Sequence, residues 1–418
     1  MIWRKLGDVC SKIGSGATPK GGSTVYVEDG ISFIRSQNVY NLTFEYSGLA
    51  HISDEAAKKL DGVAIQEDDV LINITGDSVA RTCVVPSSVL PARVNQHVAI
   101  IRPHKDVLRS RYLNYYLASP KMQAFMLGLA VGKGASRNAM TKDMIAGFEV
   151  PCPDLETQDA IIHILSAYDS LIETNQRQIK LLEEAAQRLY REWFVDLRFP
   201  GHEDVPVVDG VPVGWKRKTV SQCLSLHING GWGKESPVGK NVIPGYVIRG
   251  TDINDVKSGH YSDIPLRFHT ENDITKRALT VDDIVFELSN GNIDNIGRTL
   301  FIDDFIIERC GKHTICASFC KLFRPIDKLH ALCLYWEIQD MQLSGRMMPF
   351  KKQGANGINN FAFEDFLNHT FLVPDKYEIP RHLETIMNTI SYLQRKQATL
   401  TEARDRLLPK LMSGEIEV

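Results

Sequence analysis

The sequence lacks the long apolar segments of membrane and secreted proteins. No apolar run approaches the roughly 20 residues that span a bilayer, and residues 1–8 contain no secretory hydrophobic segment. We therefore expect a cytoplasmic protein that does not associate with a membrane. The apolar fraction of 43% and the charged fraction of 24% are ordinary for a globular protein, and 418 residues are enough for two or three domains.

A positive net charge is also missing. The formal net charge is −3, which counts against a simple nucleic-acid-binding domain because such domains are usually basic. It does not exclude nucleic-acid binding, because the position of each charge matters more than the sum. It is compatible with a subunit whose partners supply much of the phosphate neutralisation.

The cysteines do not follow the pattern of a metal site. Cys310, His313, Cys316 and Cys320 lie close together, but their spacing lacks the paired close ligands of structural zinc sites. Two of these cysteines fall in an apolar stretch, residues 315–323, that is typical of a strand. Buried reduced thiols are therefore favoured over a zinc site, and no metal ion is expected in this chain.

Catalytic signatures are absent as well. The chain contains no G-x-x-x-x-G-K-[ST] phosphate loop, and no G-x-G-x-x-G follows a strand. It also lacks the Asn-Pro and Asp-Pro-Pro runs that hold a flipped base in amino methyltransferases. Asp255-Val256-Lys257 resembles part of a nuclease metal site, but one acidic residue before one lysine is a common pattern. The sequence therefore predicts a recognition protein without catalytic activity of its own.

The main positive signal is an internal duplication. Residues 31–35, an apolar stretch that ends in arginine, recur as residues 245–249, and residues 68–71 recur as residues 282–285. The period of roughly 200 residues is far longer than the 20 to 50 residues of solenoid repeats. It indicates two complete domains of the same kind.

A long amphipathic helix is expected after each domain. In the first helix a seam recurs every three or four residues, at Leu165, Tyr168, Ile172, Asn175, Ile179, Leu182, Ala186, Leu189 and Trp193. Adding 218 to each position gives the second seam, at Leu383, Ile386, Ile390, Leu393, Gln397, Leu400, Arg404, Leu407 and Leu411. Four heptads in the same register predict a coiled coil. A helix of about 35 residues is about 50 Å long.

Three seam positions, Asn175, Gln397 and Arg404, are polar. Buried polar residues in a seam can fix the register and orientation of the helices. At a wet edge of the seam they would have no such role. The sequence leaves both interpretations open.

The expected fold is α+β, with two similar domains joined by two long antiparallel coiled-coil helices and related by a pseudo-two-fold axis. The domains are predicted at residues 1–153 and 198–376, and the helices at residues 154–197 and 377–418. A parallel pair of helices would need a long return connection, and the available link at residues 196–214 could instead belong to the second domain. Antiparallel packing is therefore favoured.

Polar side chains just past equivalent strands are the first candidates for DNA contacts. In the major groove, arginine can form two hydrogen bonds with guanine, and asparagine or glutamine with adenine. The candidates are Arg35, Gln37 and Asn38 in the first domain and Arg249, Thr251 and Asp252 in the second. Alternatively, Arg35 and Arg249 pair with nearby carboxylates and have a structural role. The loops at residues 75–81 and 290–298 are either further contacts or plain turns.

A second pair of equivalent loops provides more candidates. They are Lys133, Ser136, Arg137 and Asn138 in the first domain, and Lys351, Lys352, Gln353, Asn356, Asn359 and Asn360 in the second. Lysines in these loops would mostly contact phosphates and set the position of the domain. Amide side chains would select bases.

Several motifs in this order resemble the specificity subunits of type I restriction–modification enzymes over nearly the whole chain. The motifs are Leu6-Gly7-Asp8-Val9, Ser15-Gly16-Ala17-Thr18-Pro19, residues 30–35, LYREWFVDLRFPG at 189–201, Pro212-Val213-Gly214-Trp215, and RDRLLPKLMSGEI at 404–416. The second domain departs from the pattern, with Asn229-Gly230-Gly231-Trp232-Gly233 in place of Ser-Gly-Ala-Thr-Pro. This departure indicates that the two domains recognise different sequences.

The resemblance implies two target-recognition domains that each read one half of a split, asymmetric site on double-stranded DNA. It also implies that the paired helices set the gap between the half-sites and that two modification (methyltransferase) subunits dock on them. Those subunits would carry S-adenosylmethionine, and restriction subunits would bring translocation and cleavage with ATP and Mg²⁺. This chain itself would then need no cofactor.

Two other classes of function are distinguishable by experiment. An enzyme with an unrecognised nuclease or methyltransferase site would modify DNA alone, given Mg²⁺ or S-adenosylmethionine. A scaffold whose two domains bind proteins would fit the acidic net charge. Its complexes would protect DNA without preferring a bipartite sequence.

Overall fold

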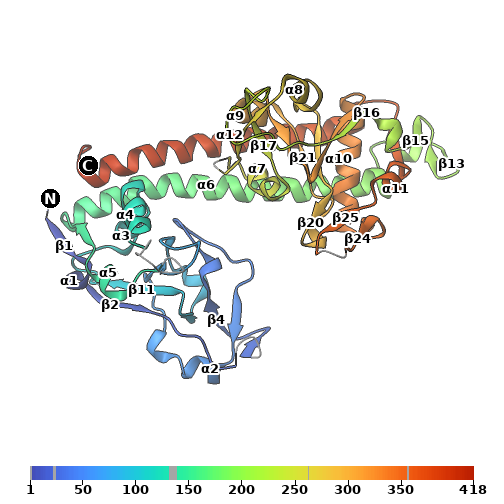
Figure 1. The fold of residues 1–418 in the computed structure, drawn as a ribbon. Helices are drawn as coiled ribbons and strands as arrows, with labels where there is room; N and C mark the ends of the chain where they lie inside the picture. The colour runs from blue at the N-terminus through green and yellow to red at the C-terminus, as the bar shows by residue number, and fades with distance from the viewer. Residues whose placement is uncertain (1, 22–24, 131–138, 262, 355–356) are drawn as a thin grey trace. The chain divides into compact units, whose positions relative to one another are not determined.

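A computed structural model describes residues 2–21, 25–130, 139–261, 263–354 and 357–418. The chain forms two compact units, Met1–Ser170 with Thr401–Val418, and Leu171–Leu400. Each unit contains one domain, which we call the first or second head, and a part of both long helices (Figure 1). No helix in the described part of the chain is long and apolar enough to cross a membrane.

The first head is built on two four-stranded sheets. The antiparallel sheet has the order β2 (Cys10–Ser15), β11 (Val98–Pro103), β8 (Val70–Asn73), β9 (Thr82–Val84). The other sheet has the order β10 (Ala92–Val94), β4 (Ile31–Ile34), β7 (Ala50–Ile52), β3 (Tyr26–Val27), and its β10–β4 pair is parallel. Both faces of β8 are covered, so all four of its residues are buried.

Shorter elements complete the first head. The strands pair as β1 (Trp3–Lys5) with β12 (Glu149–Pro151), and β5 (Val39–Tyr40) with β6 (Thr43–Phe44). The helices are α1 (Leu6–Val9), α2 (Asp54–Lys58), α3 (Ser110–Ala118), α4 (Pro120–Ala130) and α5 (Lys142–Ala146).

The second head repeats this topology. Its antiparallel sheet has the order β16 (Leu224–Asn229), β23 (Cys320–Pro325), β19 (Ile284–Glu287), β21 (Thr299–Phe301). The counterpart of the mixed sheet has the order β18 (Leu266–His269), β17 (Ile243–Ile248), β22 (Ile315–Cys316), and its β17–β22 pair is parallel. The duplicated sequence is therefore a duplicated fold, as predicted.

The remaining strands of the second head form three small sheets. They pair as β13 (Val207–Val208) with β14 (Val211–Pro212), β15 (Trp215–Thr219) with β26 (Thr370–Pro374), and β25 (Asn359–Phe361) with both β20 (Ser289–Asn290) and β24 (Lys351–Lys352). The helices are α7 (Ile253–Lys257), α8 (Glu271–Arg277), α9 (Asp304–Cys310), α10 (Lys328–Leu343) and α11 (Phe363–Leu367).

One glycine in each head explains how the differing loops after β2 and β16 fit the same fold. A Cβ on Gly16 would lie 2.1 Å from the carbonyl oxygen of Val94, and one on Gly230 would lie 2.2 Å from that of Cys316. These separations are far inside van der Waals contact, so both loops require glycine where the chain crosses the parallel strand pair. The two loops therefore differ in sequence but share the glycine that the fold requires, Gly16 in one and Gly230 in the other.

The two long helices are α6 (Leu155–Tyr190) and α12 (Glu378–Ser413), each 36 residues long. One π-helical turn, Arg191–Val195, extends α6, so the observed end agrees with the end expected near Trp193.

The helices pair antiparallel in each unit, as predicted. In the first unit, Leu165 near the start of α6 belongs to the same core as Leu411 near the end of α12. In the second unit, Tyr190 at the end of α6 shares a core with Leu383 near the start of α12. Ile179 packs with Ile390 and Leu393 between these positions. A parallel pair would bring the two starts together instead.

The seam positions differ in burial. Leu165, Ile172, Ile179, Leu383, Ile390 and Leu393 are buried, whereas Tyr168, Leu182, Leu189, Ile386, Leu400 and Leu407 are partly buried. The polar seam residues also lie inside. Asn175 is 2% exposed and Gln397 is 5% exposed, and Arg404 donates a 2.8 Å hydrogen bond to Asp169. Asn175 and Gln397 therefore do not lie at a wet edge, whereas Arg404 is partly buried and ion-paired.

The cysteines are free thiols, and all but Cys10 are buried. Burial raises the pKa of Cys316 to about 12 and that of Cys310 to about 11, so both thiols are neutral near pH 7. Within the described ranges, no three His, Cys, Asp or Glu side chains are grouped so that they could hold a metal ion. The buried-thiol interpretation of the Cys310–Cys320 cluster therefore fits its surroundings.

Candidate nucleic-acid interface

Each head contains a buried ion pair that supports its antiparallel sheet. Arg102 binds both carboxylate oxygens of Asp69 at 2.7 Å, and Arg324 binds those of Asp283 at 2.9 and 2.7 Å. The two aspartates are 0% and 1% exposed. Sequence reasoning used the repeated Asp-Asp motif as a marker of duplication but did not find its partners, which lie 33 and 41 residues further along the chain.

The predicted contact residues of the first head lie on a short 3₁₀ helix, Ser36–Asn38, directly after β4. Asn38 is 0% exposed, accepts a hydrogen bond from the Arg35 backbone and donates one to the Glu45 carbonyl. Arg35 donates a 2.7 Å bond to the carbonyl of Gly48. Gln37 is exposed. The Asn38 amide therefore holds the loop from inside, and its contact with a base stays a prediction.

The equivalent 3₁₀ helix of the second head, Gly250–Asp252, is held by charge. Asp252 is 3% exposed and forms an ion pair of 2.6 Å with Arg249. Its carboxylate raises the pKa of the Arg249 guanidinium. Arg249 thus pairs with a carboxylate of its own loop, as its structural interpretation expects, and Asp252 is buried. Thr251 is exposed at the tip of the turn.

A pocket in the first head brings two candidate loops together. Its volume is about 570 Å³, and its lining includes Gln37 from one loop and Asp77 and Arg81 from the other. The Arg81 guanidinium lies over the ring of Tyr40, 4.4 Å from its centroid. His97 also lines the pocket, and its Nδ1 lies 2.6 Å from Thr75 Oγ1. No sequence pattern pointed to Tyr40, which lies on β5, or to His97, which lies in the turn before β11.

The equivalent loops of the second head are tied to a buried carboxylate. Glu287, at the end of β19, is 1% exposed and pairs with Arg298 at 2.8 Å. The same carboxylate accepts a 2.7 Å bond from Asn290. A Cβ on Gly250 would lie 1.9 Å from it, so a glycine is required there. The loop at residues 290–298 is therefore a rigid, internally bonded structure.

The second predicted loop of the second head lies on the small sheet β20–β25–β24. Lys352, Gln353 and Asn360 are exposed, whereas Lys351 and Asn359 are partly buried. Lys351 donates to the carbonyl of Asp294 at 3.2 Å, and Asn359 donates to that of Gly291 at 2.9 Å. Asn356, like Lys133, Ser136, Arg137 and Asn138, lies outside the described residues.

The comparisons with known proteins point to one family. Residues 3–184 match the family model described as "Type I restriction modification DNA specificity domain". The type I restriction enzyme MjaIX specificity subunit of Methanocaldococcus jannaschii is 22% identical over 99% of this chain and 93% of its own length. The chain is thus similar to type I restriction enzyme specificity subunits over nearly its whole length.

Other specificity subunits are similar to parts or to the whole of this chain. The HindI specificity subunit of Haemophilus influenzae is 26% identical over 47% of this chain and 42% of its own length. A crystal structure of the type I restriction–modification S subunit from M. genitalium is similar over 98% of this chain and 95% of its own chain. Its TM-score is 0.53 at 12% sequence identity, which shows a shared fold.

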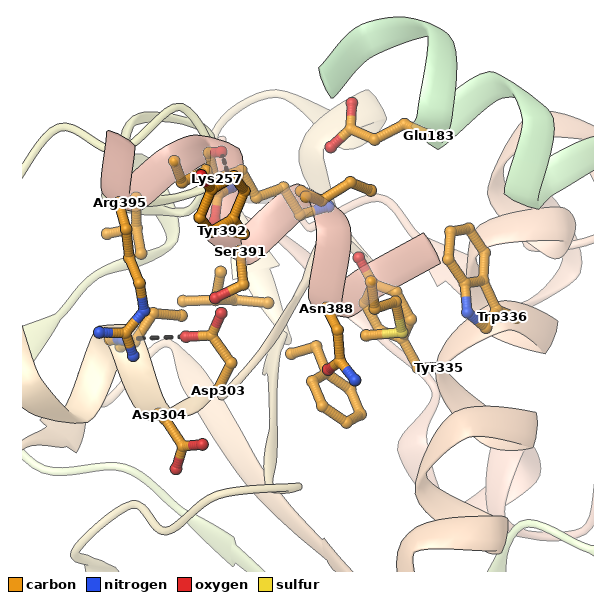
Figure 2. A pocket seen from close by; sticks show the side chains of 17 residues that line it. Glu183, Lys257, Asp303, Asp304, Tyr335, Trp336, Asn388, Ser391, Tyr392 and Arg395 are labelled. Carbon is orange, nitrogen blue, oxygen red and sulfur yellow. Dashed lines mark hydrogen bonds between the residues drawn. The ribbon is translucent and has the colours of Figure 1, made fainter. Parts of the chain in front are cut away.

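A second pocket lies in the second unit, between the long helices and the head (Figure 2). Its volume is about 310 Å³. Glu183 of α6 and Lys257 of α7 both line it, and the Lys257 ammonium lies 5.8 Å from the ring centroid of Tyr335. Burial lowers the pKa of Lys257 and raises that of Glu183. Because none of the loops that carry the predicted DNA contacts lines this pocket, we assign it no role in reading DNA.

Proposed function

We propose that this chain is a specificity subunit that recognises a bipartite, asymmetric site on double-stranded DNA, with one half-site read by each head. The observation that carries the proposal is the repetition of one head topology with different side chains in equivalent loops. Equal heads would suit a symmetric site, whereas heads that differ at their contact loops suit two different half-sites.

The distance between half-sites is a property of the long helices in this proposal. Domains related by a two-fold axis contact the same side of the duplex about one helical turn apart, roughly 34–36 Å. A helix of 36 residues is about 54 Å long. It is therefore long enough to hold that separation while its ends are packed within the heads.

The partners and cofactors follow from the same arrangement. Two modification subunits would dock on the paired helices, one for each half-site, because methylation of both strands needs an active site at each. The exposed apolar side chains of Leu171, Leu181 and Tyr392, which are 46%, 64% and 63% exposed, are available for such contacts. S-adenosylmethionine, ATP and Mg²⁺ would be bound by the modification and restriction subunits, and this chain would be non-catalytic.

Mapping methylated adenines tests the proposal. The subunit reconstituted with its modification subunits should methylate a split sequence, and alone it should neither methylate nor cleave DNA. Exchange of residues 351–360 for the same segment of another specificity subunit should change one half-site only. Methylation without a bipartite preference would contradict the proposal and favour a protein-binding scaffold.

A further inference from the structure

The two heads differ in the surroundings of a pair of structurally equivalent arginines. Arg81 directly precedes β9, and its carbonyl accepts a 2.8 Å bond from the backbone of Asn73. Arg298 directly precedes β21, and its carbonyl accepts a 2.9 Å bond from the backbone of Glu287. The same backbone bond at the same place in the sheet establishes the equivalence.

The side chains of these arginines have opposite environments. The Arg298 guanidinium is paired with the buried Glu287 and also donates to the carbonyl of Gly250 at 2.9 Å. In the first head a neutral residue, Asn73, takes the place of Glu287. Its amide donates a hydrogen bond of 2.9 Å to the Ser36 carbonyl. The Arg81 guanidinium therefore lacks a buried carboxylate partner, and it makes no hydrogen bond or ion pair with another described residue.

Arg81 is nevertheless held in place. Its guanidinium lies over the Tyr40 ring, and a cation stacked on an aromatic face keeps its plane and its donor edge in a fixed orientation. Tyr40 is 43% exposed, so this stack stands at the surface. A pre-oriented, unpaired guanidinium at the mouth of a pocket is suited to a planar acceptor with two hydrogen-bonding atoms.

The other groups of the pocket favour a base edge over a phosphate. Asp77 lines the pocket and is exposed, and its negative charge would repel a phosphate group. Toward a base pair the same carboxylate is useful, because the cytosine amino group donates to acidic side chains while guanine accepts two bonds from arginine. The pocket therefore presents a donor and an acceptor in the combination that a G·C pair requires.

We propose that Arg81 is a specificity-determining residue that reads a guanine of a G·C pair in the half-site of the first head. This inference rests on the proposed bipartite recognition of DNA. At the equivalent position of the second head, Arg298 has a structural role and reads no base. The second head must then obtain its selectivity from other loops.

The test uses the complete subunit assembled with its modification subunits and a DNA library randomised in both half-sites. Arg81→Ala should reduce discrimination against the wrong base by about 5- to 150-fold at one guanine position, which is the range for one bidentate contact. Discrimination at the other positions should stay unchanged. Arg81→Gln should shift the preference at that position from guanine toward adenine, because an amide pairs with adenine.

Arg298→Lys is the matched control, because lysine keeps the charge beside Glu287. It should leave every base preference unchanged. The half-site of the first head is the one that the 351–360 exchange leaves unaltered. Thermal melting of each variant checks that the substitution at the partly buried Arg81 has not unfolded the head.

Two results would overturn the inference. Equal weakening of binding to all sequences, with a salt dependence reduced by about one counterion, would place Arg81 on a phosphate. Unchanged preferences in Arg81→Ala would remove it from the interface. If the wild-type complex itself shows no bipartite preference, the proposed function fails instead, so the two failures are distinguishable.

Discussion

In the first head the arginine before β9 faces an open pocket, whereas in the second head the arginine before β21 is tied to a buried glutamate. The surrounding scaffold is the same in both, including the ion pairs Asp69–Arg102 and Asp283–Arg324. The two heads thus share the ion pairs that stabilise the fold and differ in the arginine beside their contact loops. A single exchange at the end of one strand, Asn73 in one head and Glu287 in the other, decides whether the arginine is paired with a buried carboxylate.

The largest expected effect tests the shared scaffold. Arg102→Ala leaves Asp69 buried without its partner, and the loss of one member of a buried pair costs about 3–5 kcal/mol. Arg324→Ala should cost a similar amount in the second head. Urea denaturation followed by circular dichroism measures both. A loss below about 1 kcal/mol in one head alone would show that the two ion pairs are not equivalent.

A smaller expected effect concerns how the stability of the second head depends on pH. Glu337 of the second head is 3% exposed and accepts hydrogen bonds from Tyr190 at 2.9 Å and from Arg346 at 2.8 Å. Burial opposes ionisation, but the bonds from His369 and Arg346 outweigh it, so the pKa of Glu337 is lowered. A carboxylate with a lowered pKa in the folded state stabilises the protein above its unfolded pKa of about 4.3 and loses that contribution as the pH falls further.

Glu337→Gln should therefore cost about 1.5–3 kcal/mol at pH 7 and progressively less below about pH 4.3. Tryptophan fluorescence during urea unfolding reports mainly on the second unit, which contains Trp193, Trp215, Trp232 and Trp336. An equal cost at every pH would mean that Glu337 is not ionised in the folded state.

The smallest expected effect concerns a surface lysine of the second head. Lys352 has a side chain that is 63% exposed and lies 3.5 Å from Asp365, which is also exposed. If it contacts a phosphate, Lys352→Ala should weaken DNA binding evenly across sequences and reduce the salt slope by about 0.9. Gln353→Ala is the neighbouring control and should leave the salt slope unchanged. A change in base preference with Lys352→Ala would contradict a phosphate contact.

The sequence was informative wherever a pattern repeats over many residues. The three-four alternation predicted α6 and α12, the link between the domains favoured their antiparallel pairing, and the recurring motifs predicted two heads of one kind. Hydrophobic periodicity carries this information because each residue's face follows from the helix geometry alone.

Individual contact residues were less predictable. The motif Arg-Ser-Gln-Asn was expected to present its polar groups to DNA, yet Asn38 is buried as a support for its own loop. The same applies to Asp252, which binds Arg249. Short polar side chains after a strand serve either purpose, and the choice depends on which backbone groups the neighbouring loop leaves without a partner.

The sequence alone therefore determined the duplication, the α+β class and the long paired helices, because these depend on local periodicity and on order along the chain. Only the tertiary structure decided which arginine is free. Arg81 and Arg298 follow similar motifs, and their difference comes from a residue on a neighbouring strand, Asn73 or Glu287. Whether a charge stands at the surface or is neutralised is set by what the fold brings beside it, which no local pattern records.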